Sequence, residues 1–194
     1  MVIFMFFVFP LFFIIRLESG ETLDQKGKKV YSIWLVPEGE QREFYRKLIE
    51  DLAREYKGPI FFPHITVLGN ICMEEENLLL KLRELAGLHR PFSVALHEVA
   101  AGSEFYRCVY IKAKKSRPLL QLYDDACRIF EKKPEDFMPH LSILYGEYDM
   151  TLKKKIASGI EIKDTLYLDS LCIYETSPNL DPKDWRLVGK IPFD

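Results

Sequence analysis

Two short segments of this chain have nearly the same sequence, and together they limit the folds that it can adopt. The segments span residues 62–69 and 138–146, and each holds a histidine, one apolar residue and a hydroxyl residue in a run of β-forming residues. The two pairs are His64 with Thr66 and His140 with Ser142. Because alternate side chains of a strand point to the same face, we expect each imidazole to lie beside its hydroxyl, with the apolar neighbours on the opposite face.

An imidazole beside a hydroxyl on each of two related strands suits in-line attack on a phosphate diester. One histidine can take a proton from the nucleophile while the other gives a proton to the leaving oxygen. The two hydroxyls can hold the non-bridging oxygens of the phosphate. His64 and His140 are therefore the candidate catalytic residues, and Thr66 and Ser142 are the candidate substrate-binding residues.

The composition limits the class of partner. The 194 residues, 48% of them hydrophobic, suffice for a packed core in one domain or two small lobes. With 27 basic and 29 acidic residues the formal net charge is −2, so the chain has no large positive field for long nucleic acid. The net charge does not exclude small phosphorylated ligands. The basic run at 153–155 is interpreted as a solvated surface, and Arg107 as a residue that can meet a phosphate.

The cysteines and the other two histidines do not indicate a metal site. The four cysteines are widely spaced and contain no C-x-x-C pair. Cys108 and Cys172 lie in apolar runs and are expected to be small buried residues. His89 and His97 lack the paired context and are interpreted as structural. The chemistry above needs neither a metal nor a cofactor, and we expect none.

The first residues differ in character from the rest of the chain. Residues 1–15 contain no charged side chain and are almost entirely large and apolar. This run is shorter than the roughly 20 residues of a membrane-spanning helix, and it lacks the basic start and small-residue cleavage site of a signal peptide. We expect residues 1–29 to be an apolar leader with a polar linker, and residues 30–194 to form a single bilobal domain. Any membrane contact would involve only residues 1–15.

Hydrophobic periodicity divides the rest of the chain into strands and helices. Strands are expected at 30–36, 62–69, 92–100, 106–113, 138–146, 165–175 and 185–191, and helices at 42–56, 74–88, 118–132 and 151–158. The order strand, helix, histidine strand occurs twice, over 30–69 and 106–146. Such a duplication predicts two lobes related by a pseudo-two-fold axis, with the histidine strands facing each other across a cleft.

With these motifs the chain resembles the 2H phosphoesterase superfamily. Two H-x-[ST] motifs carry the resemblance, each preceded by proline and followed by a hydrophobic strand and glycine. The segments 30–37, 105–110 and 137–145 extend it. Within the superfamily the chain is most similar to the cyclic phosphodiesterases that act on ADP-ribose cyclic phosphate and nucleoside 2′,3′-cyclic phosphates. The likeness covers about residues 30–193.

The resemblance implies an α+β, bilobal fold in which two antiparallel sheets face a central cleft and carry helices on their outer faces. It implies that His64 and His140 are the catalytic pair and that Thr66 and Ser142 donate hydrogen bonds to the phosphate. Tyr145 matches a tyrosine that lines the site near the substrate in such enzymes. Tyr145 lies five residues after His140, and residues an odd number apart on a regular strand point to opposite faces. A bend or a strand end is therefore needed for the Tyr145 side chain to face the cleft.

The implied reaction is the metal-independent hydrolysis of small cyclic phosphates. ADP-ribose 1″,2″-cyclic phosphate would give ADP-ribose 1″-phosphate, and nucleoside 2′,3′-cyclic phosphates would give 2′-phosphates. Such an enzyme is expected to be a cytoplasmic monomer that serves the metabolism of tRNA splicing. The apolar N-terminus leaves a secretory or membrane-associated location as the alternative.

Two other functions remain as alternatives. The first is an RNA-end processing esterase that acts on 2′,3′-cyclic or 2′-5′ linked RNA, which the near-neutral charge disfavours. The second is a nucleotide-binding module without catalysis. The two intact motifs disfavour that module, because binding alone needs no pair of proton donor and acceptor.

Overall fold

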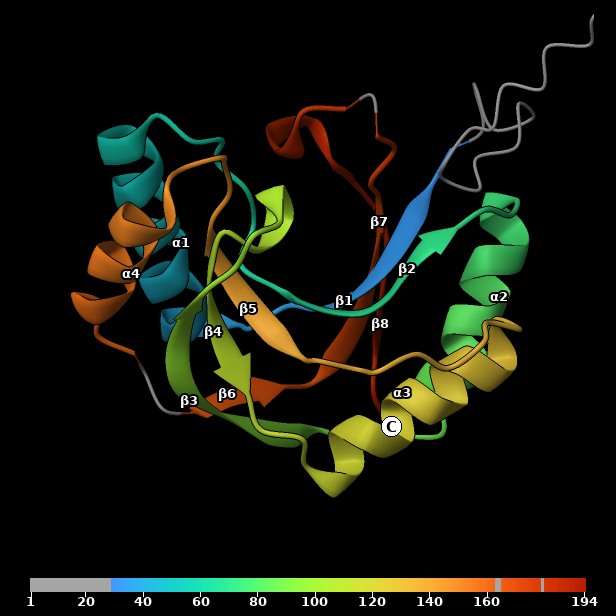
Figure 1. Cartoon of the computed structure of the whole chain (residues 1–194). Coiled ribbons are helices and arrows are strands. Elements are labelled where there is room, and N and C mark those ends of the chain that lie inside the picture. Colours follow the sequence, from blue (N-terminus) through green and yellow to red (C-terminus); the bar gives the residue numbers. More distant parts are fainter. Residues whose placement is uncertain (1–28, 163–164, 179) are drawn as a thin grey trace, which may run out of the picture.

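Residues 29–162, 165–178 and 180–194 are described by the computed structural model of this chain. They form one curled antiparallel sheet of eight strands, flanked in the described part by four α-helices (Figure 1). The expected leader and almost all of the linker, residues 1–28, lie outside the described residues. Of the helices that are described, none combines the length and the apolar character needed to cross a membrane.

The sheet consists of two four-stranded halves. The strand order is β6-β3-β4-β5-β2-β1-β7-β8, and all neighbours are antiparallel. The strands are β1 (Tyr31–Leu35), β2 (Ile65–Ile71), β3 (Phe92–Ala101), β4 (Val109–Ala113), β5 (His140–Leu144), β6 (Thr165–Leu168), β7 (Ser170–Glu175) and β8 (Arg186–Pro192). The halves join between β2 and β5, where Ile65 and Leu141 are the one pair in register. These halves confirm the expected α+β, bilobal architecture, with the two expected antiparallel sheets joined edge to edge into one.

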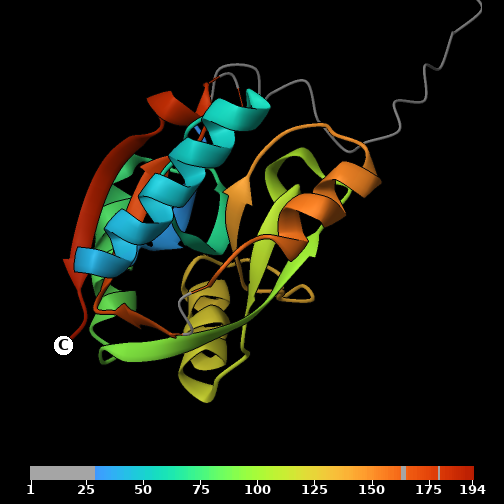
Figure 2. The same cartoon turned by 90° about the vertical axis from the view of Figure 1, so that its left-hand side faces the viewer.

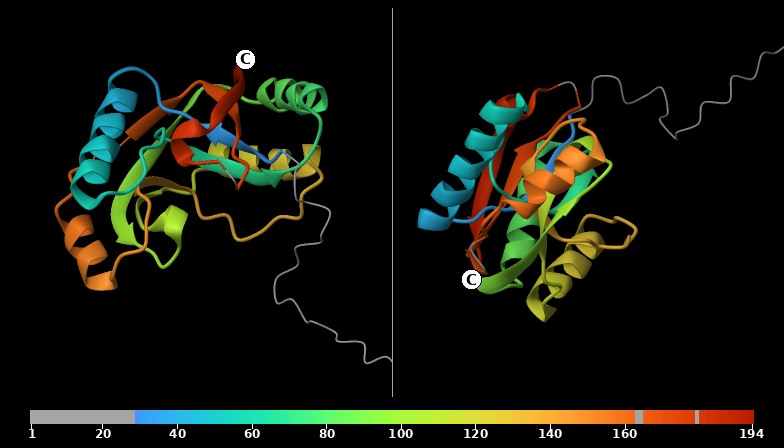
Figure 3. Two further views of the ribbon diagram at one scale, coloured as in Figure 1. Left: turned by 90° about the horizontal axis from the view of Figure 1, so that it is seen from above. Right: turned by 60° about the vertical axis from the view of Figure 1, so that its left-hand side comes forward.

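The helices cover the two halves in pairs. Helices α1 (Gly39–Tyr56) and α4 (Met150–Ser158) pack on the half that contains β3, β4 and β5. Helices α2 (Glu75–Ala86) and α3 (Arg117–Ile129) pack on the half that contains β2, β7 and β8. Seen from above, the two helix pairs lie on opposite sides of the molecule (Figure 3). Helix α1 follows β1 in the chain but packs on β5, and α3 follows β4 but packs on β2. Each of these two helices therefore connects one half of the sheet to the other.

The expected duplication of strand, helix and histidine strand is present as β1-α1-β2 and β4-α3-β5. Its strand pairs also match in register. Trp34 of β1 is opposite Thr66 of β2, and Tyr110 of β4 is opposite Ser142 of β5. Trp34 and Tyr110 therefore occupy equivalent positions in the two halves, each facing the hydroxyl residue of one motif.

Two strand predictions need correction. The strand expected at 106–113 begins only at Val109, because Phe105–Arg107 form a 3-10 turn before it. The strand expected at 165–175 is two strands separated by Asp169. The first of these pairs with β3 and the second with β1, so the chain passes at this point from one half of the sheet to the other.

The two faces of the sheet pack differently. In β1 the alternate residues Tyr31, Ile33 and Leu35 belong to the main hydrophobic core under the helices. Trp34 lies on the opposite face, in a small separate cluster. The members of that cluster are Trp34, Val36, Cys172 and Tyr174, with the partly buried Trp185 packed against them. Trp34 is buried, but outside the main core.

The segment between α1 and β2 approaches the end of β5 closely. Helix α1 ends where Lys57 adopts a left-handed conformation with φ of 58°. A Cβ atom at the next residue, Gly58, would lie 2.8 Å from the carbonyl oxygen of Tyr145, so this position suits only glycine. The chain before His64 is thereby held against the chain after His140, although the two segments are far apart in the sequence. Figure 2 shows α1 running diagonally in front of the sheet.

Candidate active site

The two histidines have the same backbone setting. His64 directly precedes β2, and its Nδ1 lies 2.6 Å from the carbonyl oxygen of Phe62. His140 begins β5, and its Nδ1 lies 2.8 Å from the carbonyl oxygen of Met138. A carbonyl oxygen can only accept a hydrogen bond, so in both rings Nδ1 carries the proton. In the neutral ring Nε2 is then the basic nitrogen, and both histidines offer the same atom for proton transfer.

The electrostatics of the two imidazoles are linked. Burial lowers the pKa of His64 to about 4, against the opposing hydrogen bond to Phe62, and the charge of a protonated His140 lowers it further. Burial also lowers the pKa of His140. A proton on His140 thus disfavours a proton on His64. Both rings are mainly neutral at pH 7 in the absence of substrate.

His64 belongs to a stack of three rings. Its imidazole lies on the indole of Trp34, with ring centroids 3.6 Å apart and planes 11° apart. The phenol ring of Tyr174 also stacks on that indole, at 4.2 Å and 21°. The stack connects the residue before β2 with β1 and β7, and Trp185 meets the indole edge-on at 5.4 Å. These contacts leave His64 only 7% exposed.

His140 has a different neighbour. Tyr110, the residue equivalent to Trp34, meets its imidazole edge-on, with ring centroids 5.3 Å apart and planes 72° apart. The charge of Arg107 lowers the pKa of His140, and that of Glu104 raises it. His140 is partly buried rather than fully buried. The duplication therefore preserves the backbone setting of the two histidines but gives them different surroundings.

The two hydroxyl residues also differ. Ser142 is buried, and its Oγ donates a hydrogen bond of 2.9 Å to the carbonyl oxygen of Tyr106. The Thr66 side chain is partly buried, and its hydroxyl has no hydrogen-bond partner among the described residues. The Thr66 hydroxyl is thus available to a ligand, whereas the Ser142 hydroxyl already donates to a backbone carbonyl oxygen.

Tyr145 lies beyond the end of β5, which meets the requirement raised by its odd offset. Its ring is buried and stacks on Phe61 at 3.6 Å. It also contacts the rings of Tyr106 at 5.3 Å and Trp185 at 6.2 Å. Because Trp185 lies 6.4 Å from the ring of His64, Tyr145 belongs to the aromatic surroundings of the site. Burial raises the pKa of its phenol far above the ordinary value, so this group stays neutral.

The two remaining histidines lie away from this constellation. His89 is buried, with Nε2 3.4 Å from a carboxylate oxygen of Asp125 on α3, and His97 is exposed on β3. As expected, Cys108 and Cys172 are buried. Within the part of the chain that the structure describes, no three His, Cys, Asp or Glu side chains gather as a metal site.

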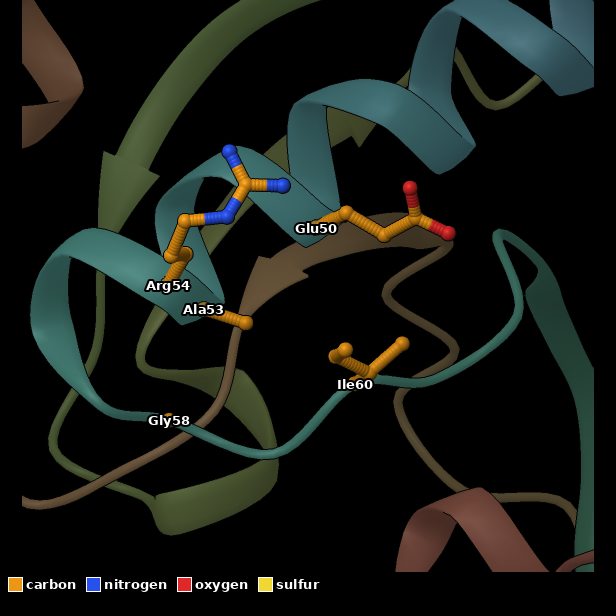
Figure 4. A pocket seen from close by; sticks show the side chains of 5 residues that line it. All are labelled: Glu50, Ala53, Arg54, Gly58 and Ile60. Atoms are coloured by element: carbon orange, nitrogen blue, oxygen red, sulfur yellow. The ribbon is translucent and has the colours of Figure 1, made fainter.

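A separate pocket lies at the end of α1. It has a volume of about 390 Å³ and is lined by Glu50, Ala53, Arg54, Gly58 and Ile60 (Figure 4). None of the residues of the two motifs lines it. The pocket is therefore distinct from the arrangement around His64 and His140.

Comparisons with known proteins agree with the fold. Residues 30–191 match the family described as cyclic phosphodiesterase-like protein. The chain is 26% identical over 133 residues to the cyclic phosphodiesterase of Arabidopsis thaliana, which covers 68% of this chain and 74% of that protein.

Two solved structures share the fold. One is Escherichia coli LigT in complex with 3′-AMP, with a TM-score of 0.56 and 12% identity over 86% of this chain and 98% of the other. The second is TT0787 of Thermus thermophilus, with a TM-score of 0.57 and 16% identity over 84% of this chain and 97% of the other. The family match spans most of the chain, so the chain belongs to the cyclic phosphodiesterase-like family of the 2H phosphoesterase superfamily. It is therefore a phosphoesterase.

Proposed function

We propose that the chain hydrolyses cyclic phosphodiesters of small nucleotides. The substrates would be ADP-ribose 1″,2″-cyclic phosphate, opened to ADP-ribose 1″-phosphate, and nucleoside 2′,3′-cyclic phosphates, opened to 2′-phosphates. The observation that carries the proposal is the matched pair of imidazoles, which share one tautomer and lie close enough for the charge of His140 to lower the pKa of His64. The name of the Arabidopsis relative and the nucleotide bound to LigT support a substrate of this class.

In the proposed reaction one imidazole accepts a proton from water at Nε2 as the water oxygen attacks phosphorus. The other imidazole, protonated at Nε2, gives its proton to the sugar oxygen as the ring P–O bond breaks. The negative charge of the bound phosphate favours the imidazolium form and so offsets the effect of burial. After one turnover the two rings have exchanged protonation states, and proton exchange with solvent restores them. Each ring contributes roughly 10² to 10⁴ in rate, as is usual for general acids and bases.

Three further side chains complete the proposed site. Thr66 and Ser142 donate hydrogen bonds to the non-bridging oxygens, on which charge increases in the transition state. Tyr145 contributes to the aromatic wall near the substrate through its contacts with Tyr106 and Trp185. No step of this chemistry requires a metal ion, so activity is expected to persist in EDTA.

The enzyme is proposed to act as a cytoplasmic monomer on small cyclic phosphates, without long nucleic acid as a partner. The net charge of −2 supports this choice over an RNA-end processing esterase. Salt separates the two: binding of a mononucleotide depends weakly on ionic strength, whereas binding of RNA depends steeply on it because counterions are released.

A turnover assay tests the function. Purified protein is incubated in EDTA with 2′,3′-cyclic AMP and, separately, with ADP-ribose 1″,2″-cyclic phosphate, and the products are separated by chromatography. Conversion to the 2′-phosphate and the 1″-phosphate is expected. A protein that binds these compounds but converts neither would instead be the nucleotide-binding module, and a requirement for Mg²⁺ or Zn²⁺ would contradict the metal-free reaction.

A further inference from the structure

The loop between β3 and β4 is held rigidly beside His140. This loop, residues 102–108 and hereafter the Arg107 loop, contains the 3-10 turn Phe105–Arg107. Four hydrogen bonds fix it: Gly102 N to Cys108 O at 2.9 Å, Lys153 Nζ to Gly102 O at 2.9 Å, Gly146 N to Phe105 O at 3.1 Å and Ser142 Oγ to Tyr106 O at 2.9 Å. A side chain on this loop is therefore positioned before any ligand arrives.

Two residues explain the closure of the Arg107 loop. A Cβ atom at Gly102 would lie 2.2 Å from the carbonyl oxygen of Arg107, so only glycine allows the two ends to meet. Lys153 of α4 is 4% exposed, and its ammonium group donates to the Gly102 carbonyl. The run 153–155 was expected to be a solvated surface, and for Lys153 this expectation is wrong. Its ammonium group is satisfied inside the protein and supports the loop.

The guanidinium of Arg107 lies on the side of the sheet that carries the second motif. Its Cζ is 6.0 Å from the ring centroid of Tyr110, and that ring is 5.3 Å from the imidazole of His140. Tyr110 is in register with Ser142, and His140 lies two residues before Ser142 on the same strand. The side chains of Tyr110, Ser142 and His140 therefore share one face of β4 and β5. The effect of the Arg107 charge on the pKa of His140 agrees with this placement.

Arg107 forms an ion pair with Glu104, three residues earlier in the same loop. The Glu104 side chain is 61% exposed and that of Arg107 is 30% exposed. Exposed pairs of this kind contribute only about 0 to 1 kcal/mol, because each charge is already well hydrated. An anion that met the guanidinium could therefore replace the carboxylate at little cost. Another cation near the motif, Lys112, is opposite His140 in register but is paired with Glu98 at 3.0 Å.

We propose that Arg107 binds a non-bridging oxygen of the substrate phosphate beside His140, and that this phosphate displaces Glu104 from the guanidinium. The inference rests on the proposed hydrolysis of cyclic phosphates and adds a substrate-binding residue to it. Arginine suits the role because its planar guanidinium can donate two parallel hydrogen bonds to phosphate oxygens. Binding would begin in the ground state, where the diester carries one negative charge, so the effect falls mainly on KM.

The test compares the wild type with Arg107→Met, which keeps the length of the side chain but removes its charge. Inorganic phosphate is titrated into each protein and followed through the NMR signals of the His140 ring, and the kinetics with 2′,3′-cyclic AMP are measured in parallel. We expect Arg107→Met to weaken phosphate binding and raise KM by roughly 10- to 100-fold, as for the loss of a hydrogen bond to a charged group. Arg107→Lys should recover part of the loss.

Two further variants sharpen the result. Glu104→Gln removes the competing carboxylate and is expected to tighten phosphate binding by up to about fivefold. Arg128→Met is the matched control, because Arg128 forms a similar pair with Asp125, at 2.9 Å and three residues apart, on the outer helix α3. It should leave phosphate binding and KM unchanged.

Each outcome decides a separate point. Wild-type affinity and KM in Arg107→Met, with the His140 ring signals showing a native site, would overturn the role of Arg107. Weaker phosphate binding in Glu104→Gln would overturn the displacement of the carboxylate. Phosphate binding that depends on Arg107 in a protein that hydrolyses no cyclic phosphate would refute the proposed function but retain the anion site.

Discussion

The imidazole of His64 lies flat on the indole of Trp34, with ring centroids 3.6 Å apart and planes 11° apart. The stack restricts rotation of the imidazole, whose Nδ1 is already fixed by the Phe62 carbonyl. It also excludes water from one face of the ring. His140 has no such support, because the equivalent residue, Tyr110, meets it edge-on.

Replacing Trp34 should therefore impair the action of His64. Trp34→Leu removes the flat surface and leaves the imidazole free to turn, so we expect kcat for 2′,3′-cyclic AMP to fall about tenfold or more, as when catalytic geometry is lost. Trp34→Phe keeps a flat ring and should lose less. Steady-state kinetics and the NMR tautomer signals of His64 provide the measurement.

Destabilisation alone would not explain that result. Loss of a large buried aromatic side chain costs about 3 to 5 kcal/mol in stability, so thermal unfolding is measured for each variant and assays are run well below the transition. A folded Trp34→Leu protein with wild-type kcat and an unchanged His64 tautomer would show that the indole serves packing only.

The dependence of rate on pH should be bell-shaped with its maximum on the acid side of neutrality. The reaction needs one protonated and one neutral imidazole, and the pKa values of both are lowered, that of His64 to about 4 from 6.5. The value of kcat/KM should fall at low pH as the second ring is protonated, and at high pH as the last proton is lost. The substrate diester keeps its single charge throughout this range. A maximum at about pH 8 or above would contradict the burial of the pair.

The two hydroxyl residues should contribute unequally. Thr66→Ala removes a donor that has no other partner in the described structure and should lower kcat/KM by roughly 10², the usual effect of losing one oxyanion donor. Ser142→Ala should cost less, about tenfold, because Ser142 Oγ must first give up its bond to Tyr106. Thr66→Ser and Ser142→Thr serve as controls that keep the hydroxyl. Equal losses, or a larger loss at Ser142, would contradict this order.

Burial of neutral His64 should make stability depend on pH. Its pKa is 6.5 in the unfolded chain and about 4 in the folded protein, so between these values the unfolded chain binds more protons. Stability should be highest above pH 6.5 and should decrease as the pH falls to about 4, by about 3 kcal/mol for this shift. Chemical denaturation at several pH values measures it. His64→Gln, which cannot be protonated, should show a smaller decrease; an unchanged decrease would assign it to other groups.

The sequence indicates the parts of the site that depend on local patterns. Strand alternation and the repeated motif place His64 beside Thr66 and His140 beside Ser142, and the periodicity of the helices identifies the duplication. The Trp34 stack is not local, because it depends on the register of β1 with β2. In β1, Ser32 and Trp34 alternate with residues of the main core. This alternation is the only feature of the sequence that points to the stack.

The position of Arg107 is equally hard to derive from sequence. The apolar run around it predicts a strand, in which alternate residues share a face, but the 3-10 turn at Phe105–Arg107 breaks that alternation. The turn is set by contacts with distant residues, Lys153 of α4 and Gly146 after β5. The crossing of the chain at Asp169 likewise depends on which strands β6 and β7 pair with, rather than on the residues within them.

The central claim is that the two imidazoles act together as acid and base, and turnover of 2′,3′-cyclic AMP by His64→Ala and His140→Ala tests it most directly. Each variant should lose roughly 10² to 10⁴ in kcat. The double variant should lose little more than the more affected single variant, because the two groups act in one step. Near-normal turnover by either folded single variant would contradict the paired mechanism.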